Sequence, residues 1–419
     1  MPIQPIEAIA AGLFAAALLH TFATKLFEGL AHRNPRHAGL FHLLGEVEVV
    51  FGFWAMVLIV AIALFASPRE AVTYAESRKY TEPLFVFVIM VIAASRPVLE
   101  FVQAALGRIA ARLPGRTEVA EIWLGLALVP LLGSFITEPA AMTLAALTLA
   151  PTVFRAGMPE WKKYAALGVL FVNISIGGTL TSYAAPPVLM VASAWGWDTA
   201  FMAREFGWKA VIAVIVNASA VTALLSDQAR PHRPAGEGTP REPVPLVFSL
   251  IHLAFAAGVV ASAHHPVIFL GLFLFFLGFT QAYARHQDPL VLKEGLLVGF
   301  FLAGLVVLGG MQQWWLQPLV SGLAPLALFF SAVALTAFTD NAALTYLGSL
   351  IPDLSAESRS MLVAGAVAGG GLTVIANAPN PAGVALLRRG FEDESIGAGG
   401  LLAGALLPTA VACAAFVLL

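Results

Sequence analysis

Two acidic residues interrupt otherwise apolar stretches at matched positions. Glu138 lies in Thr-Glu-Pro-Ala-Ala, which begins at residue 137, and Asp340 lies in Thr-Asp-Asn-Ala-Ala, which begins at residue 339. An ionised carboxylate far from water is costly, so each needs a cation, a proton or a hydrogen-bonding partner. Two such carboxylates brought together would form a cation site that also binds protons. Capping of a helix is the structural alternative for both residues.

Two Gly-rich motifs follow the acidic interruptions, and both carry hydroxyl or amide side chains. They read GGTLTSYAAPP over 177–187 and GGGLTVIANAP over 369–379. A hard cation such as sodium prefers oxygen ligands of this kind. With Glu138 and Asp340 as the predicted sodium ligands, the remaining candidates for ion or substrate binding are Thr137, Thr179, Thr181, Ser182, Thr339, Asn341, Thr373, Asn377 and Asn380. Local capping of broken helices is the alternative role of these residues.

Three further polar residues begin the apolar stretch 41–66, namely His42, Glu46 and Glu48. His42 and Glu46 are four residues apart and share a face of a continuous helix, whereas Glu48 points elsewhere. We predict that they line a proton entrance from the cytoplasm. The alternative is a helix end that lies at the membrane interface.

The composition fits a bilayer. The chain of 419 residues is 59% hydrophobic and only 11% charged, whereas soluble domains carry roughly 25% charged residues. The net charge of −2 gives no basic surface for nucleic acid. The single cysteine, Cys413, excludes a disulfide. We find no motif of a hydrolase, metalloprotease or nucleotide-binding enzyme, and no cofactor is predicted.

The predicted fold is an all-α integral membrane protein of about ten transmembrane helices. The continuous spans are predicted at 8–30, 41–66, 83–107, 207–226, 245–262, 266–284, 290–309 and 398–418. Two broken helices, 162–195 and 359–388, complete the set. The stretches 119–154 and 318–352 are predicted to be re-entrant hairpins, with their polar tips at 134–139 and 336–341, because irregular chain at membrane depth must line protein or a cavity.

The matched motifs predict an internal repeat. A third matched pair, Glu82-Pro83-Leu84 and Asp288-Pro289-Leu290, precedes the other two in the same order. Repeat 1 is predicted to comprise an N-terminal span and loop, 1–40, and the rest of the repeat, 41–226. A linker over 227–244 then leads to repeat 2, which is predicted over 245–419. If both hairpins return to their own side, each repeat crosses the membrane five times. An odd number of crossings makes the second repeat inverted relative to the first.

Charge supports this topology. The loops that then face one side carry fourteen Lys and Arg residues, and those on the other side carry five. Positive loops face the cytoplasm, which predicts a multi-pass protein of the inner cell membrane with both termini outside the cytoplasm. The basic loops are predicted at 31–40, 108–118, 155–163, 227–244, 285–289 and 388–395.

The hairpin tips and Gly-rich loops, each occurring twice, resemble those of the ion transporter superfamily, which includes NhaD-type antiporters. The segment FTDNAALTYLGSLIP resembles the second hairpin of a family of sodium/proton antiporters. The Ser-Asn-Thr signature of the related symporters is absent from both tips, which disfavours dicarboxylate or citrate transport. The resemblance implies a homodimer in which a transport domain moves like an elevator against a fixed scaffold.

The residues and the resemblance together predict a secondary active transporter that exchanges sodium for protons. Sodium is then a transported substrate, and the partners are small cations and the lipid bilayer. Sodium-coupled transport of an oxyanion or carboxylate is the alternative. A bilayer-embedded enzyme and a channel or structural membrane protein are the other classes considered.

Overall fold

The computed structural model describes residues 5–155, 157–228, 242–320 and 322–419, and it contains helices but no strand in these ranges. The first half forms α1 Pro5–Arg33, α2 Ala38–Gly45, α3 Val47–Phe65, α4 Pro68–Glu76, α5 Thr81–Ala93, α6 Arg96–Ala110, α7 Thr117–Leu126, α8 Leu128–Ile136, α9 Glu138–Leu149, α10 Glu160–Gly177, α11 Pro186–Trp195, α12 Thr199–Met202 and α13 Trp208–Leu225. The second half forms α14 Leu246–Ala261, α15 Pro266–Ala282, α16 Leu292–Gly309, α17 Gln313–Val320, α18 Pro325–Thr336, α19 Asn341–Ser349, α20 Ala356–Gly369, α21 Asn380–Leu387 and α22 Ala398–Leu418. The predicted all-α class is therefore confirmed.

The helices include enough long apolar segments for a multi-pass membrane protein. Six helical segments in the described residues can cross a bilayer by length and composition, and two bent helix pairs raise the number to eight. The predicted number of about ten is higher. Part of the difference comes from α14 and α15, which have 16 and 17 residues, and from the broken helix formed by α20 and α21.

Two spans predicted to be straight are broken. Between α5 and α6 the chain bends by 62°. Pro97 lies at the start of α6, where it has no N–H to continue the preceding helix. The span predicted at 41–66 is interrupted at Glu46, whose backbone is extended (φ −81°, ψ 122°), so that α2 and α3 are separate helices. These breaks change which side chains share a face.

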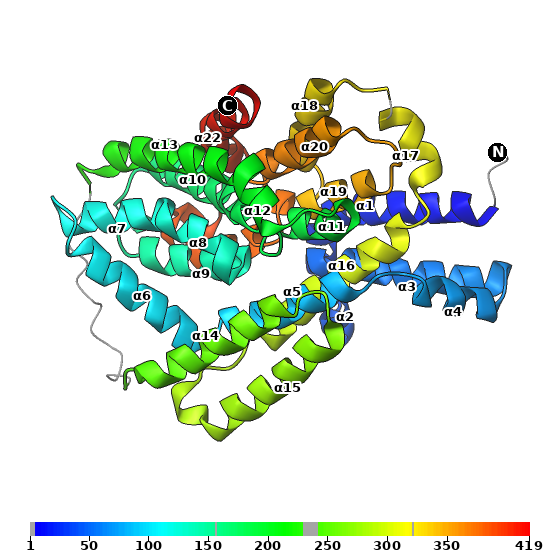
Figure 1. The fold of residues 1–419 in the computed structure, drawn as a ribbon, viewed down its shortest axis with the longest axis horizontal. Helices are drawn as coiled ribbons and strands as arrows, with labels where there is room; N and C mark the ends of the chain where they lie inside the picture. The colour runs from blue at the N-terminus through cyan, green and yellow to red at the C-terminus, as the bar shows by residue number, and fades with distance from the viewer. Residues whose placement is uncertain (1–4, 156, 229–241, 321) are drawn as a thin grey trace.

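The apolar side chains form two large cores. The first is built mainly by α6–α10, α13 and α20–α22, and the second by α1, α3, α5, α14–α16 and α19. In Figure 1, α10, α13 and α22 lie along one edge of the molecule and α14 and α15 along the opposite edge. Helix α11 contributes to both cores: Val188 and Val191 belong to the first, whereas Leu189 and Met190 belong to the second. The boundary between the cores therefore runs along α11.

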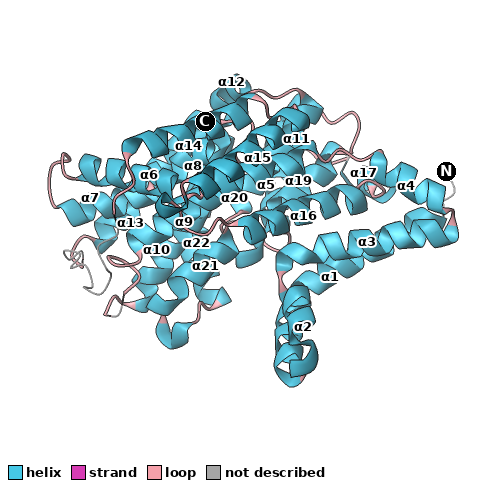
Figure 2. Cartoon of the chain, turned by 90° about the horizontal axis from the view of Figure 1, so that it is seen from below, coloured by secondary structure: helices cyan, strands magenta, loops and turns pink. Residues whose placement is uncertain are grey.

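Helices α1 to α4 project from the rest of the molecule (Figure 2). Their outward surface carries large apolar side chains, including Leu19, Phe22, Leu64 and Phe65, which are between 56% and 77% exposed. A soluble protein rarely exposes such a continuous apolar surface. Contact with lipid tails explains this surface in a membrane protein.

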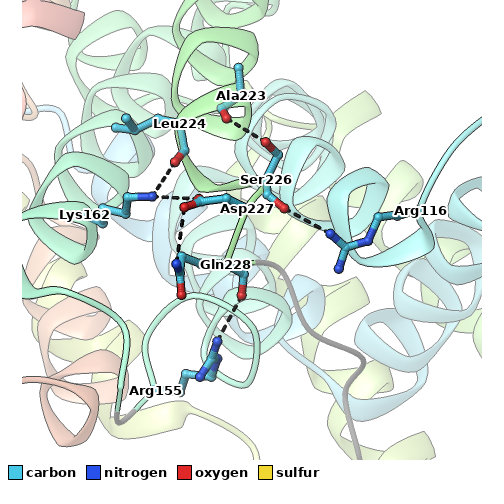
Figure 3. A network of polar contacts seen from close by, with 8 residues as sticks. All are labelled: Arg116, Arg155, Lys162, Ala223, Leu224, Ser226, Asp227 and Gln228. Atoms are coloured by element: carbon cyan, nitrogen blue, oxygen red, sulfur yellow. Dashed lines mark hydrogen bonds and ion pairs between the residues drawn. The ribbon is translucent and has the colours of Figure 1, made fainter.

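Three basic side chains bind carbonyl groups at the C-terminal end of α13 (Figure 3). The bonds run from Lys162 to Leu224, from Arg155 to Gln228, and from Arg116 to Ser226, at 2.8, 3.0 and 3.1 Å. Cations are favoured there because the last carbonyls of a helix lack partners within it. The Lys162 ammonium also donates to Asp227 at 2.7 Å and holds the pKa of that carboxyl below its usual value. These contacts fix the start of the predicted linker 227–244, of which 229–241 lie outside the described residues.

Helix α16 crosses α3 at glycines that allow backbone to touch backbone. A Cβ atom added to Gly304 would lie 2.3 Å from the backbone nitrogen of Gly52. No side-chain rotation relieves such a clash, because both partners are backbone. Close approach through small residues is the usual way that membrane helices associate.

Gly304→Ala is therefore expected to destabilise the protein by about 1–3 kcal/mol, the usual cost of overpacking. Gly271→Ala is the matched control, since a Cβ atom there meets nothing within 4 Å. Thermal unfolding of the detergent-solubilised variants measures the effect. A melting temperature equal to that of the parent for Gly304→Ala would show that the two helices are not closely packed.

Candidate cation site at the helix breaks

Glu138 lies at a sharp break between α8 and α9. Thr137 joins the two helices with φ 73° and ψ 151°, a backbone conformation that suits glycine and costs other residues about 1–3 kcal/mol. Pro139 follows near the start of α9, where its missing N–H needs no helical partner. Glu138 is the first residue of α9 and its side chain is completely buried. The local sequence thus places a carboxylate at a strained and buried turn.

The Glu138 carboxylate has a single neutral hydrogen-bond donor. Its Oε2 atom accepts from Asn377 Nδ2 at 2.8 Å, whereas Oε1 has no partner among the described residues. Gly178 allows this packing, because a Cβ atom there would lie 2.5 Å from Oε1. One neutral donor does not offset the cost of burying a carboxylate charge. Glu138 is therefore suited to bind a proton or a cation.

Asp340 caps α19, the helix that follows the second predicted tip. Its Oδ1 atom accepts from the backbone N–H groups of Ala342 and Ala343 at 2.8 and 3.2 Å. The capping role considered as an alternative is thus observed for Asp340, whereas Glu138 makes no capping bond. Asn377, which donates to Glu138, also lines a small cavity with Asp340. A cap uses one oxygen and does not prevent the same carboxylate from binding a cation.

The broken helices hold the two tips in place. In the first half, Thr181 donates to the Ser134 carbonyl at 2.7 Å, and Ser134 donates to the Gly177 carbonyl at 2.7 Å. In the second half, Thr373 donates to the Ala337 carbonyl at 3.0 Å. Each unwound loop is therefore bound to the tip of its own half, and the bond from Asn377 to Glu138 connects the two halves.

Several buried oxygen atoms at these breaks have no partner in the described part of the chain. They are Thr137 Oγ1, Glu138 Oε1, Thr336 Oγ1, Asn341 Oδ1, Asn377 Oδ1 and Asn380 Oδ1. The amide nitrogens of the three asparagines are engaged, on Ser175, on Glu138, and on the carbonyls of Gly370 and Thr373. An amide whose nitrogen donates to the protein leaves its oxygen available as an acceptor. These oxygens are the kind of ligand that a hard cation requires.

The second tip borders a small cavity of about 20 Å³, lined by Asp340, Asn377 and Glu48 among others. This is room for about one water molecule or a bare ion. A wider cavity of about 280 Å³ also contains Glu48, and it extends past Pro139 to Glu46 and Lys293. The two cavities share Glu48, Val298, Ala378 and Pro381 in their walls.

The predicted proton entrance is only partly reproduced. Glu46 and Glu48 line the wider cavity, and Glu46 forms a salt bridge with Lys293 at 2.8 Å. His42 is exposed on α2 and lines neither cavity. The predicted continuous helix over 41–66 ends at Gly45, and the extended backbone at Glu46 separates His42 on α2 from Glu48 on α3.

Three predicted residues serve mainly local structure. Thr179 donates to the Ile176 carbonyl of its own turn at 2.6 Å, and Thr339 contacts the Asp340 carbonyl at 3.3 Å. Ser182 contacts Thr199 at 3.3 Å and lines a separate cavity of about 420 Å³ with Glu82 and other residues. That cavity contains neither tip.

The sequence reasoning missed Ser134 and Ser175 as individual site residues. Ser134 binds the Leu180 N–H and the Gly177 carbonyl, and Ser175 binds Asn341 and the Val367 carbonyl. Ser134 stands in the predicted tip 134–139, which was the available signal for it. Ser175 precedes its Gly-rich loop by two residues and has no such signal.

The site contains carboxylate, amide and hydroxyl oxygens but no basic partner. No Lys or Arg in the described ranges forms a salt bridge with Glu138 or Asp340. The same ranges contain no group of three His, Cys, Asp or Glu side chains arranged for a metal ion. Such a set suits weak, reversible binding of a monovalent cation better than a resident metal.

The membrane-spanning helices, their breaks and this buried polar site define a transport protein. The family model described as "Putative Na+/H+ antiporter" matches residues 5–419, so the chain belongs to that family. The resemblance seen in the sequence is thereby confirmed, and the chain is a transporter and not an enzyme.

One solved structure with a similar chain path is the crystal structure of the Alcanivorax borkumensis YdaH transporter, described as having an unusual topology. It has 13% sequence identity and a TM-score of 0.44, and the match covers 88% of this chain and 96% of that one. None of the curated proteins searched matches the chain.

Asn377→Ala removes the one donor to Glu138 found among the described residues, together with a buried oxygen that has no partner there. We expect a raised apparent KM for sodium in proteoliposomes, with a smaller effect on thermal stability, because Asn377 is a single side chain at a cavity wall. Asn34→Ala, an exposed change far from the site, is the control. Unchanged sodium dependence in a well-folded Asn377→Ala variant would limit Asn377 to a structural role.

Proposed function

We propose that this transporter exchanges sodium for protons at a shared site formed by Glu138 and Asp340. The observation that carries the proposal is the complete burial of the Glu138 carboxylate, which has one neutral donor and no basic partner among the described residues. Such a group is neutral when it binds a proton, or compensated when it binds a cation. Sodium and protons then compete for the same oxygens, and this competition couples their movements.

The second carboxylate strengthens this competition. Two nearby negative charges repel each other, so the pair binds its first cation or proton more tightly than either group alone. The protons of such a pair belong to the pair and not to one residue. We propose that the carrier crosses the membrane only when a cation or a proton compensates its negative charge. Ions then do not leak across without exchange.

Elevator motion is the proposed route across the membrane. The two apolar cores suggest the two bodies: the first contains α8, α9, α10 and α20, and the second contains α3, α5 and α16. We propose that the second core without α19 is the scaffold. The first core then moves together with α19, which packs against α11 and α20 and carries Asp340 at its start. Helix α11, which packs against both, would lie at the sliding surface.

An inverted repeat is the proposed origin of this arrangement. Helix α11 packs against α19, and in reciprocal fashion α21 packs against α9. Ser175 bonds to the carbonyl of Val367, and each stands two residues before the first glycine of its own Gly-rich loop. Contact between equivalent positions is expected beside a twofold axis. These contacts support two interlocked halves with hairpins over 119–154 and 318–352.

The orientation and assembly are part of the same proposal. We propose that residues 31–40 and 285–289 face the cytoplasm, because their loops are basic, and that both termini lie on the other side of the inner cell membrane. A homodimer would hold the scaffold of each copy fixed. The alternative substrate, an oxyanion or carboxylate carried with sodium, is less compatible with the site, because no described basic side chain pairs with Glu138 or Asp340.

The carboxylate variants Asp340→Asn and Glu138→Gln test the proposed exchange. An asparagine keeps the helix cap that Asp340 provides, so the fold is expected to survive while coupled exchange is lost. Glu138→Gln is expected to lose it as well, because the amide fills the same volume without a titratable charge. Sodium-driven proton flux into proteoliposomes is the measurement.

Glu357→Gln, an exposed change in the first turn of α20, is the control for these variants. Parental flux with an unshifted pH profile in both carboxylate variants would reject the shared site. Flux driven by an added oxyanion or carboxylate, with no response to sodium alone, would support the alternative substrate.

A further inference from the structure

Glu48 occupies the junction between the wide outer cavity and the small cavity at Asp340. It lines both, and the small cavity between Glu48, Asp340 and Asn377 has a volume of about 20 Å³. Asn377 is 1% exposed, and its oxygen has no partner in the described residues. A buried acceptor of this kind, together with two carboxylates around a space for about one water molecule, indicates a polar occupant.

The groups around Glu48 give the outer cavity an acidic wall. Glu46 lies beside it and pairs with Lys293 of α16, whose side chain is 67% exposed, and Glu294 of the same helix lines the wide cavity. The second oxygen of Glu46 is buried without a partner in the described chain. From α1, His20 binds the Leu44 carbonyl and the Trp54 indole near the start of α3. The acidic groups outnumber the one lysine in this wall.

We propose that Glu48 is a third acidic group of the ion path, through which sodium and protons pass between the outer cavity and Asp340. The inference rests on the proposed exchange at Glu138 and Asp340, and it assigns the route by which that site is reached. Sodium would move from the Glu48 carboxylate to the Asp340 carboxylate across the small cavity. A proton would leave protonated Glu48 and arrive on ionised Asp340, by way of one bridging water, without any other reactant.

The location of Glu48 relates this role to the proposed elevator motion. Glu48 lies in the first turn of α3, whereas Asn377, Glu138 and Asp340 lie at the breaks of the broken helices and hairpins. If these breaks, with α19 and its Asp340, move against α3, Glu48 stays behind. Glu48 then exchanges ions with Asp340 only in the conformation described here, so it acts on the side of the membrane toward which the wide cavity opens.

The variants Glu48→Gln and Glu48→Asp test the proposal in proteoliposomes. Glu48→Gln is expected to lower sodium-driven proton flux on the order of a hundredfold, the smaller end of what a positioned proton-transfer group contributes. Its pH profile is expected to change shape, and Glu48→Asp should restore part of the flux. Glu76→Gln, an exposed change on α4, should behave like the parent. Parental flux and pH profile in Glu48→Gln would overturn the proposal.

A second measurement remains informative even if the parent shows no sodium/proton exchange. Cys413 is the only cysteine, so Glu48→Cys in a Cys413→Ala background gives a single reactive thiol. A membrane-impermeant thiol reagent should modify it from the side of residues 285–289, and sodium should slow this reaction. Asp340→Asn should remove the sodium protection.

Modification from the opposite side only, or a rate indifferent to sodium in the presence of Asp340, would overturn the route through Glu48. If sodium protects the thiol at position 48 but the parent protein shows no sodium-driven proton flux, the proposed exchange is rejected and the route through Glu48 is kept. The two ideas therefore fail separately.

Discussion

The structure depends on keeping the Glu138 carboxylate buried beside neutral oxygen atoms. A carboxylate at membrane depth has no water to solvate it, and the part of the chain that the structure describes gives Glu138 one amide donor and no basic partner. The strained Thr137, the neighbouring Gly178 and the unwound loop that carries Asn377 all serve to hold this group in contact with the other half of the chain. The strained Thr137 backbone and the buried carboxylate lower the stability of the fold. They leave Glu138 as a group that needs a cation or a proton.

The breaks in the helices follow from the same requirement. A continuous helix satisfies its own backbone and offers a cation only side chains, whereas an interrupted helix exposes carbonyl and N–H groups at its ends. In this protein the interruptions are closed by hydroxyl side chains such as Thr181 and Thr373, which bind backbone carbonyls of the tips. The amide oxygens remain available as ligands, because the described hydrogen bonds of these asparagines use their amide nitrogens.

Much of this arrangement could be predicted from the sequence, because polar residues are rare in the apolar stretches and therefore informative. The low charge content and the matched motifs around Glu138 and Asp340 indicated the membrane class and the breaks. The bend at Ser95 and the break at Glu46 could not be predicted, since both lie in stretches that read as continuous spans. Glu48 shares a cavity with Asp340, whereas Ser182 lines another cavity, and this difference depends on how distant helices pack. No local pattern contains that information.

Competition between sodium and protons for the Glu138–Asp340 pair is the central claim, and proton release on sodium binding measures it directly. Purified protein in detergent and weak buffer would receive sodium chloride, with choline chloride as the control, while a pH indicator follows proton release. Radioactive sodium bound by the same sample gives the occupancy. We predict that proton release rises in step with sodium occupancy and disappears when both carboxylates are replaced by amides. Saturable sodium binding to the parent protein without any proton release would contradict the claim.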